Sequence, residues 1–274
     1  MKNSTVNLLL KIIKKKFTNS IKLNNKYKSK LWNFAQQMIL LIIWVILWQI
    51  FYLSVNNDII IANPYSVFCK IIDLIFISCT AWPKIFISTL RTLCGFFLAI
   101  VFSITIAFVT NLSKFIKYFL NPLIHIIKTT PIACFIILAL IWVPSFWIPS
   151  FISFLIAFPI LYSNILKGVA SVEPNLIEMS KVFRFSRWNK MKMIYFPAIK
   201  PHFFSSCVSG IGLAWKSGIS AEVISNSRNS IGMEIYFSQV HLNTINLFAW
   251  TIIIAFFSSI LEKIVLKGIF RNYA

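Results

Sequence analysis

Three charged side chains fall within long apolar stretches of this sequence, and they are the residues best able to do chemistry there. They are Arg91, Lys216 and Glu222. A charge near the centre of a membrane helix costs about 2.5–3.5 kcal/mol on insertion scales, so such a residue is by default a candidate for function. Arg91 lies near one end of its apolar stretch, where its long side chain can instead reach the membrane surface. Both interpretations of Arg91 stay open.

Lys216 and Glu222 are six residues apart, which in one helix means about 9 Å of rise and about 240° of turn. They therefore do not pair well with each other within that helix. Either each finds a structural partner elsewhere in a helix bundle, or, in a homodimer, two copies of this helix face a shared pathway in which Lys216 attracts an anion. We keep Arg91, Lys216 and Glu222 as candidate pathway residues.

A second group of candidates lies in a polar loop between two apolar stretches, at residues 168–197. A passive connection between helices needs only a few residues, and this loop is much longer. Pro174 suits the first turn of a short helix. Leu176, Met179, Ser180 and Phe183 then follow at helical spacing and share one face of that helix.

A second short helix is expected in the same loop. Ser186 is a suitable N-cap for a helix over Arg187–Tyr195, and Pro197 is expected to end it. Both helices are amphipathic and rich in positive charge. An apolar stripe of this kind either lies on the bilayer surface or fits a groove in a partner protein, and the residues alone do not decide between the two.

Other kinds of chemistry find little support. The five cysteines and three histidines show no metal-ligand spacing, although Cys69 and Cys79 are placed to share a loop, where a disulfide is conceivable. The sequence has no G-x-x-x-x-G-K-[ST] motif to hold ATP phosphates, and no Ser/His/Asp or paired-carboxylate arrangement on a soluble domain. We therefore expect no cofactor in this chain and no enzymatic activity of its own.

The composition is that of a membrane protein. The 274 residues are 58% hydrophobic and only 12% charged, and apolar runs recur that are long enough to cross a hydrocarbon core as helices. No alternating apolar and polar pattern favours a barrel. The net charge of +20 would suggest nucleic acid in a soluble protein, but here the basic residues lie between and beside the apolar runs. We predict an all-α integral membrane protein with no nucleic-acid partner.

About six membrane spans are predicted, with only a tight turn at Pro144–Pro149 between the third and the fourth. They are Phe34–Leu53, Ile85–Val109, Ile126–Val143, Trp147–Leu166, Ala198–Ile224 and Ile245–Leu266. An even number of spans places both termini on one side of the membrane. Most of the 27 Lys and Arg residues lie in the segments on that side, which makes both termini and the 168–197 loop cytoplasmic.

The sequence therefore divides into a basic cytoplasmic segment, residues 1–33, and a transmembrane domain, residues 34–274, that carries the long loop. The basic segment is rich in Lys and Asn and has too few apolar residues to form a core. It either lies on the anionic lipid surface of the inner leaflet or remains a solvated tail.

The long loop also resembles the signature loop of binding-protein-dependent ABC permeases, E-A-A-x-x-x-G followed by L-P. Here the loop reads Glu178-Met179-Ser180-Lys181-Val182-Phe183-Arg184, then Phe196-Pro197. In that family the loop forms a coupling helix that sits in a cleft of the ATPase subunit. The resemblance makes Glu178, Met179, Ser180, Arg184 and Pro197 the candidate ATPase-coupling residues.

This copy of the loop departs from the family pattern in two places. Met179-Ser180 replaces the small Ala-Ala pair, and Arg184 replaces the glycine. A glycine there permits a left-handed turn between the two helices, whereas arginine in that conformation costs about 1 kcal/mol or more. We expect either a reshaped turn or a strained one.

Further short matches to the nitrate/sulfonate/taurine-type branch of the family occur in order over roughly residues 63–267. They are Leu90–Phe96, Asn121-Pro122-Leu123, Thr130-Pro131, Phe158-Pro159-Ile160, Gly168-Val169, Gly212–Lys216, Ala221-Glu222-Val223, Ser230-Ile231-Gly232 and Phe248-Ala249-Trp250. Each match is weak by itself, but the ordered set is specific.

The resemblance implies the permease subunit of an ATP-binding-cassette importer in the cell membrane, with MetI-like architecture. It also implies a homodimer around the pathway, a separate ATPase that binds the ATP, and a separate solute-binding protein. The solute would be a nitrate-, sulfonate- or taurine-like anion or a small heterocyclic precursor. The alternative is a self-sufficient secondary transporter driven by an ion gradient, which would need intramembrane acids, and Glu222 is nearly the only one present.

Overall fold

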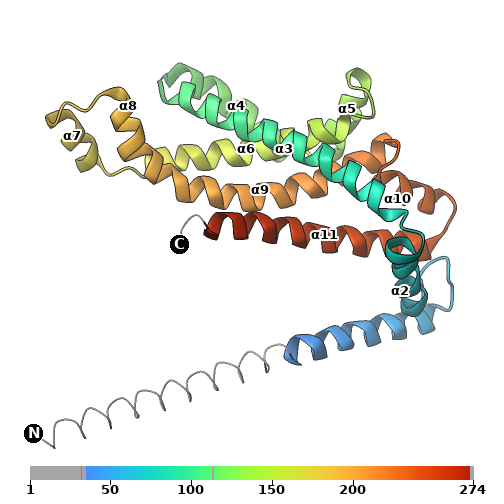
Figure 1. Cartoon of the computed structure of the whole chain (residues 1–274). Coiled ribbons are helices and arrows are strands. Elements are labelled where there is room, and N and C mark those ends of the chain that lie inside the picture. Colours follow the sequence, from blue (N-terminus) through green and yellow to red (C-terminus); the bar gives the residue numbers. More distant parts are fainter. Residues whose placement is uncertain (1–31, 33–34, 113, 272–274) are drawn as a thin grey trace, which may run out of the picture. The chain divides into compact units, whose positions relative to one another are not determined.

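The computed structural model describes residue 32 and residues 35–112 and 114–271 (Figure 1). The chain divides into two compact units, residues 1–64 and 65–274, which we describe separately. In the first unit one apolar helix, Ala35–Val55, matches the predicted span Phe34–Leu53, except that Phe34 lies outside the described residues. Apart from Trp32, the basic segment 1–33 also lies outside them, so its placement stays a prediction.

The described residues of the second unit form helices and no strands (Figure 1). In chain order they are α2 (Pro64–Ile72), the π-helix η1 (Asp73–Ile77), α3 (Ala81–Leu112), α4 (Lys114–Thr129), α5 (Ile132–Trp142), α6 (Ile148–Ala170), α7 (Pro174–Val182), α8 (Arg187–Lys190), the π-helix η2 (Met191–Tyr195), α9 (Phe196–Ser225), α10 (Ile231–Val240) and α11 (Thr244–Arg271). The prediction of an all-α protein is therefore confirmed.

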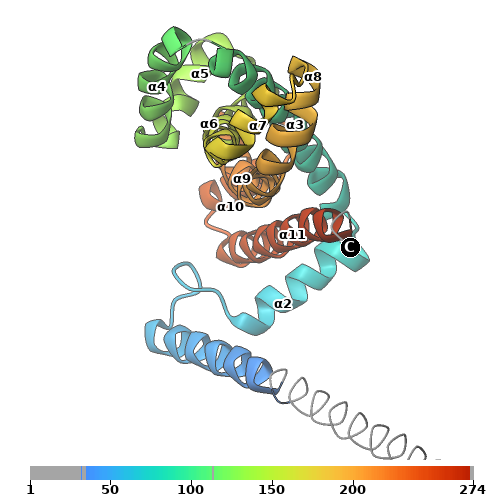
Figure 2. The ribbon, with the colours of Figure 1, turned by 90° about the vertical axis from the view of Figure 1, so that its left-hand side faces the viewer.

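The core of the second unit is formed where α3, α6 and α9 lie side by side, as Figures 1 and 2 show. Phe96, Leu161, Tyr162 and Ile211 are among its buried side chains. Gly95 of α3 lies against the backbone carbonyl of Ser150 in α6, where any side chain would overlap that oxygen. Small residues of this kind let membrane helices approach closely.

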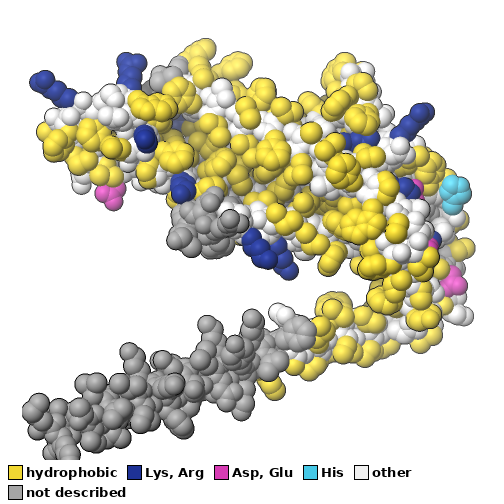
Figure 3. Space-filling view, viewed as in Figure 1, with side chains coloured by type: hydrophobic (Ala, Val, Ile, Leu, Met, Phe, Trp, Pro, Cys, Tyr) yellow, Lys and Arg dark blue, Asp and Glu magenta, His cyan; other side chains and the backbone are white. Residues whose placement is uncertain are grey.

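Four described helices are long and apolar enough to cross a membrane: Ala35–Val55, α3, α6 and α11. They match the first, second, fourth and last predicted spans. Hydrophobic side chains cover most of the face seen in Figure 3, as expected of a surface in contact with lipid. The predicted turn before α6 is also present, with the Trp147 N–H donating to the Pro144 carbonyl at 2.9 Å.

The predicted fifth span corresponds to α9, which has 30 residues but is not among the helices that pass this test of apolarity. Its composition reflects its position, because α9 packs against α3, α6, α10 and α11. Its buried residues include Ser206, Gly210, Ser217 and Gly218. A helix surrounded by other helices needs small residues at its contacts more than it needs apolar residues all round.

The predicted third span, Ile126–Val143, is wrong as a single helix. The chain breaks at Thr130-Pro131, and α4 and α5 meet there at 107°. Pro131 has an extended backbone (ψ 136°) and has no N–H to continue the hydrogen bonds of α4. The bent pair α4–α5 counts as one further span or as a re-entrant segment, which gives up to five apolar spans in the described residues.

Candidate functional site

The loop between α6 and α9 keeps the turn of the family motif despite its missing glycine. Arg184 has a φ of 48°, in the left-handed region. The Phe185 N–H donates to the Ser180 carbonyl at 2.9 Å, and the Arg184 N–H donates to the Lys181 carbonyl at 3.1 Å. This pair of bonds is the Schellman ending of α7, which glycine usually provides. Of the two expectations the strained turn is therefore the correct one, at a cost of about 1 kcal/mol.

The apolar stripe predicted on α7 is present and is partly exposed. Phe183 is 69% exposed, Leu176 41% and Met179 39%, so each keeps surface that the described residues do not cover. Glu178 is also exposed. Ser180 differs, because it is buried and its hydroxyl donates to the Ile177 carbonyl at 2.6 Å. Ser180 is therefore covered by protein, whereas Leu176, Met179 and Phe183 keep surface for an outside contact.

The second loop helix begins where it was predicted to begin. The Ser186 hydroxyl accepts a hydrogen bond from the Asn189 N–H at 3.2 Å, so Ser186 is the N-cap of α8. This confirms the capping prediction. Ser186 gives α8 a fixed start directly after the Arg184 turn. The turn and the cap, each closed by hydrogen bonds, together set the position of α8 relative to α7.

The prediction that Pro197 ends this helix is wrong. The helix runs on through η2 into α9, and Pro197 lies in the first turn of α9. In η2 the Phe196 N–H donates to Met191, five residues back instead of four. This wider turn shifts the hydrogen-bond register just before Pro197, the residue that has no N–H to donate. As a result, the loop between α6 and α9 is joined to a 30-residue helix without a break in the helix.

At the far end of α9 two of the three charged residues of the apolar stretches, Arg91 and Glu222, come together. Arg91 of α3 and Glu222 of α9 are 3% and 0% exposed, and Arg91 Nη1 lies 3.5 Å from Glu222 Oε1. Arg91 Nη2 also donates to the Arg228 carbonyl at 3.0 Å, and its guanidinium lies 4.2 Å from the centre of the Phe146 ring. The partner of Glu222 that sequence reasoning left open is thus Arg91.

Glu222 also fixes the start of α10. Its Oε2 accepts hydrogen bonds from the Ser88 hydroxyl at 2.7 Å and from the Gly232 N–H at 3.2 Å. The Ser88 hydroxyl in turn accepts from the Ile231 N–H at 3.1 Å. A side chain at position 232 would overlap Glu222, so the glycine is needed for this contact. At the first turn of α10 the carboxylate therefore accepts from the free N–H of Gly232, and the Ser88 hydroxyl accepts from that of Ile231.

Lys216 is exposed on α9 and does not take part in this cluster. The assignment of Arg91, Lys216 and Glu222 to a translocation pathway therefore stays a prediction, with Arg91 and Glu222 enclosed by protein in this single chain. Cys69 and Cys79 are both exposed free thiols. Sequence reasoning missed Ser88, although its spacing of three residues before Arg91 places both side chains on one face of α3.

Comparison with known proteins identifies the class of protein to which this arrangement belongs. Residues 99–271, more than half of the chain, match the family described as the binding-protein-dependent transport system inner membrane component. The chain belongs to this family, and it is a membrane-spanning permease subunit of the ATP-binding-cassette transporters, as its motifs predicted. The matched region contains the whole coupling loop and Glu222.

Individual relatives agree with this assignment. The chain is 23% identical over 232 residues to the taurine transport system permease protein TauC of Escherichia coli (strain K12), covering 82% of each chain. It is 22% identical to the putative aliphatic sulfonates transport permease protein SsuC of Bacillus subtilis (strain 168), covering 90% of each. It is 29% identical to the nitrate import permease protein NrtB of Synechocystis sp. over 52% of each.

A solved structure has the same fold. An amino acid ABC transporter with histidines aligns with a TM-score of 0.56 and 17% identity, covering 69% of this chain and 90% of that chain. This similarity shows the fold alone. The relatives support the predicted branch of ABC permeases and give no support to a self-sufficient secondary transporter.

Proposed function

We propose that this permease is driven by a separate ATPase that docks on α7 and transmits its closure through η2 to α9. The observation that carries the proposal is the exposed stripe of Leu176, Met179 and Phe183 on a helix whose C-terminal end is fixed by a hydrogen-bonded turn. Of the two surfaces that suit such a stripe, the bilayer and a partner's groove, membership of the ABC permease family favours the groove. Glu178 and Arg184 are exposed in the same short segment and supply charges for the contact.

The transmission has a structural basis in the chain itself. The Schellman turn at Arg184 and the Ser186 cap tie α7 to α8, and α8 continues without interruption through η2 and Pro197 into α9. A displacement of α7 is therefore carried into a span that crosses the core. We assign Pro197 to this joint, where the residue lies just after the π-helix.

Two copies of the chain would form the pathway, and a separate solute-binding protein would deliver the solute. Since the relatives named above are permeases for taurine, aliphatic sulfonates and nitrate, we propose a small anion as the solute. The exposed ammonium of Lys216 on α9 is suited to attract such an anion. The chain itself would bind no ATP, because it has no phosphate-binding loop.

Uptake of radiolabelled taurine by intact cells tests the energy source. Inactivating the partner ATPase should abolish uptake, whereas collapsing the proton and sodium gradients while ATP is maintained should leave uptake unchanged. Uptake that continues without the ATPase and stops with the gradients would contradict the proposal and support a secondary transporter.

The orientation is tested by labelling with an impermeant thiol reagent, located by peptide mass. We propose that both termini and the loop are cytoplasmic. Cys79, in the segment that enters α3, should then react in intact cells, whereas the introduced thiol of Ser186→Cys should react only after the membrane is opened. Labelling of position 186 from outside would contradict this topology.

A further inference from the structure

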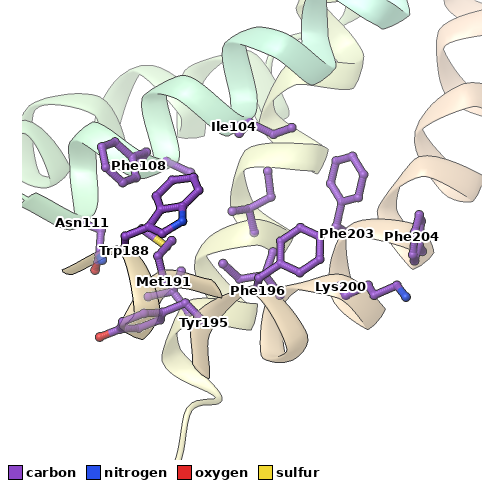
Figure 4. A pocket seen from close by; sticks show the side chains of 14 residues that line it. Ile104, Phe108, Asn111, Trp188, Met191, Tyr195, Phe196, Lys200, Phe203 and Phe204 are labelled. Carbon is purple, nitrogen blue, oxygen red and sulfur yellow. The ribbon is translucent and has the colours of Figure 1, made fainter. Parts of the chain in front are cut away.

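An apolar cavity of about 390 Å³ lies beside the coupling loop, between α3, the end of α6 and the first turns of α9. Figure 4 shows Ile104 and Phe108 of α3 on one side and Trp188 of α8, Tyr195 of η2 and Phe196 of α9 on the other. Apart from Asn111 and Lys200, the lining residues are apolar or aromatic. The volume lies in the range of small-molecule pockets.

The cavity opens to the outside of this unit and is not sealed in its core. Ile104 and Phe108 are each 49% exposed, Phe196 63% and Trp188 74%. Such exposure is costly for aromatic side chains in water, so either lipid or a protein surface must occupy the opening.

The position of the cavity along α3 favours lipid. Ile104 and Asn111 are seven residues apart at the end of the span Ala81–Asn111, so the cavity extends about 10 Å from the end of the span towards its middle. The helix is 31 residues long, about 46 Å, and the hydrocarbon core is about 30 Å thick, so this end of the helix lies at the membrane interface, where acyl chains meet headgroups. The exposed face of α7 lies in a different segment of the loop.

The charges near the cavity favour an anionic lipid. Lys200 lines the cavity, and the segment 187–200 that forms one wall also contains Arg187, Lys190 and Lys192 and no acidic residue. The Lys200 ammonium lies 5.9 Å from the centre of the Phe204 ring, so its stem runs along the apolar wall. Clusters of basic residues beside a membrane span recognise anionic headgroups, and Trp and Tyr are enriched at the same depth.

We propose that this cavity binds an acyl chain of an anionic phospholipid, with the headgroup against the basic residues of segment 187–200. The lipid fills the space next to η2 and so stabilises the connection between the 168–197 loop and α9. The inference rests on the membrane-spanning placement of α3 and not on docking of the ATPase.

The test uses the purified permease in phosphatidylcholine nanodiscs that contain increasing amounts of a phospholipid with a dibrominated acyl chain. The emission of Trp188 is obtained by subtracting the fluorescence of the Trp188→Phe variant from that of the parent chain. Brominated phosphatidylglycerol should quench this emission at a several-fold lower mole fraction than brominated phosphatidylcholine. Lys200→Gln should reduce the preference about fivefold, which corresponds to the ~1 kcal/mol that a basic residue near an anionic surface contributes.

Two matched controls locate the effect. Lys263→Gln, on exposed α11 surface, should leave the preference unchanged. Val169→Phe fills the cavity and should abolish the preferential quenching, whereas Val101→Phe, at a position 59% exposed and outside the cavity lining, should not. Equal quenching by the two brominated lipids would overturn the proposal, since it shows only general contact with the bilayer.

Absence of quenching by either lipid would also overturn the proposal and would show that protein covers the cavity. The nanodiscs contain no ATPase, and transport is not measured. A failure here therefore leaves the coupling proposal unaffected, and a failure of coupling in cells leaves this lipid site unaffected.

Discussion

The two ends of α9 show opposite arrangements of polar and apolar groups. At its start, the coupling loop presents Leu176, Met179 and Phe183 to the outside, although the loop lies beyond the apolar spans. At its end, the charged pair Arg91 and Glu222 is buried among helices. Pro197 and Glu222 are about 37 Å apart along the helix. An exposed apolar face indicates a missing partner, whereas a buried carboxylate that is paired with Arg91 and accepts hydrogen bonds from Ser88 and Gly232 indicates a fixed joint.

The comparison assigns different roles to the two ends. The contacts of Glu222 with Arg91, Ser88 and Gly232 join α3, α9 and α10 into one unit. The loop has contacts that fix its own shape, but its apolar face remains open. Changes at the buried end should therefore lower stability, and changes at the loop should affect partner binding with little effect on stability.

The largest effect is expected for Glu222→Ala. Removing one member of a buried pair leaves the Arg91 charge without its carboxylate, which costs about 3–5 kcal/mol. The midpoint of thermal unfolding in detergent should fall by several degrees. The matched control is Glu234→Ala, since Glu234 pairs with Lys84 at 2.7 Å but both side chains are 26% exposed. This pair should contribute only about 0–1 kcal/mol. Equal losses in the two variants would refute the distinction between a buried and a peripheral ion pair.

The next effect is expected for Phe183→Ala at the other end. Phe183 is 69% exposed in this chain, so its removal should leave the unfolding midpoint unchanged. If Phe183 is an anchor in the ATPase groove, the affinity should fall about tenfold or more. Retention of the ATPase during affinity purification measures this. Phe76→Ala, at a position 74% exposed in η1, is the control and should not affect retention. A drop in stability without loss of the ATPase would contradict the role given to the stripe.

The smallest effect is expected for Arg184→Gly. Glycine adopts a φ of 48° without strain, so the variant should be more stable by about 1 kcal/mol. Arg187→Gly makes the same change within α8, where glycine should cost about 0.5–1 kcal/mol. Opposite shifts of the unfolding midpoint in the two variants are therefore predicted. Uptake by Arg184→Gly should be at least as fast as that of the parent chain. A loss of stability in both variants would show that the turn is not strained.

Much of this fold was predictable from the sequence because membrane helices are recognised by their length and apolarity. Ala35–Val55, α3, α6 and α11 lie where long apolar runs were found. The Ser186 cap followed from local chemistry, and the left-handed Arg184 was one of the two outcomes that the family motif left open. These features depend on residues close together in the chain.

The features that sequence reasoning missed depend on hydrogen-bond register or on distant contacts. Pro197 was expected to end a helix, as proline usually does. The five-residue hydrogen-bond spacing of η2, which accommodates it, has no clear sequence signal. The bend at Pro131 was overlooked within an apolar run. The Arg91–Glu222 pair joins residues 131 positions apart. The only sequence signal for it was that both are charged residues within apolar stretches.

The central claim is that the exposed face of α7 is the surface on which the ATPase docks. It is tested most directly by replacing Met179 with the photo-crosslinking residue p-benzoylphenylalanine in the assembled transporter. Ile141, 68% exposed on α5, is replaced in the same way as the control. The account predicts a covalent adduct with the ATPase from position 179 and none from position 141. If the complex hydrolyses ATP and transports solute, but position 179 crosslinks only to lipid or to nothing, the account is contradicted.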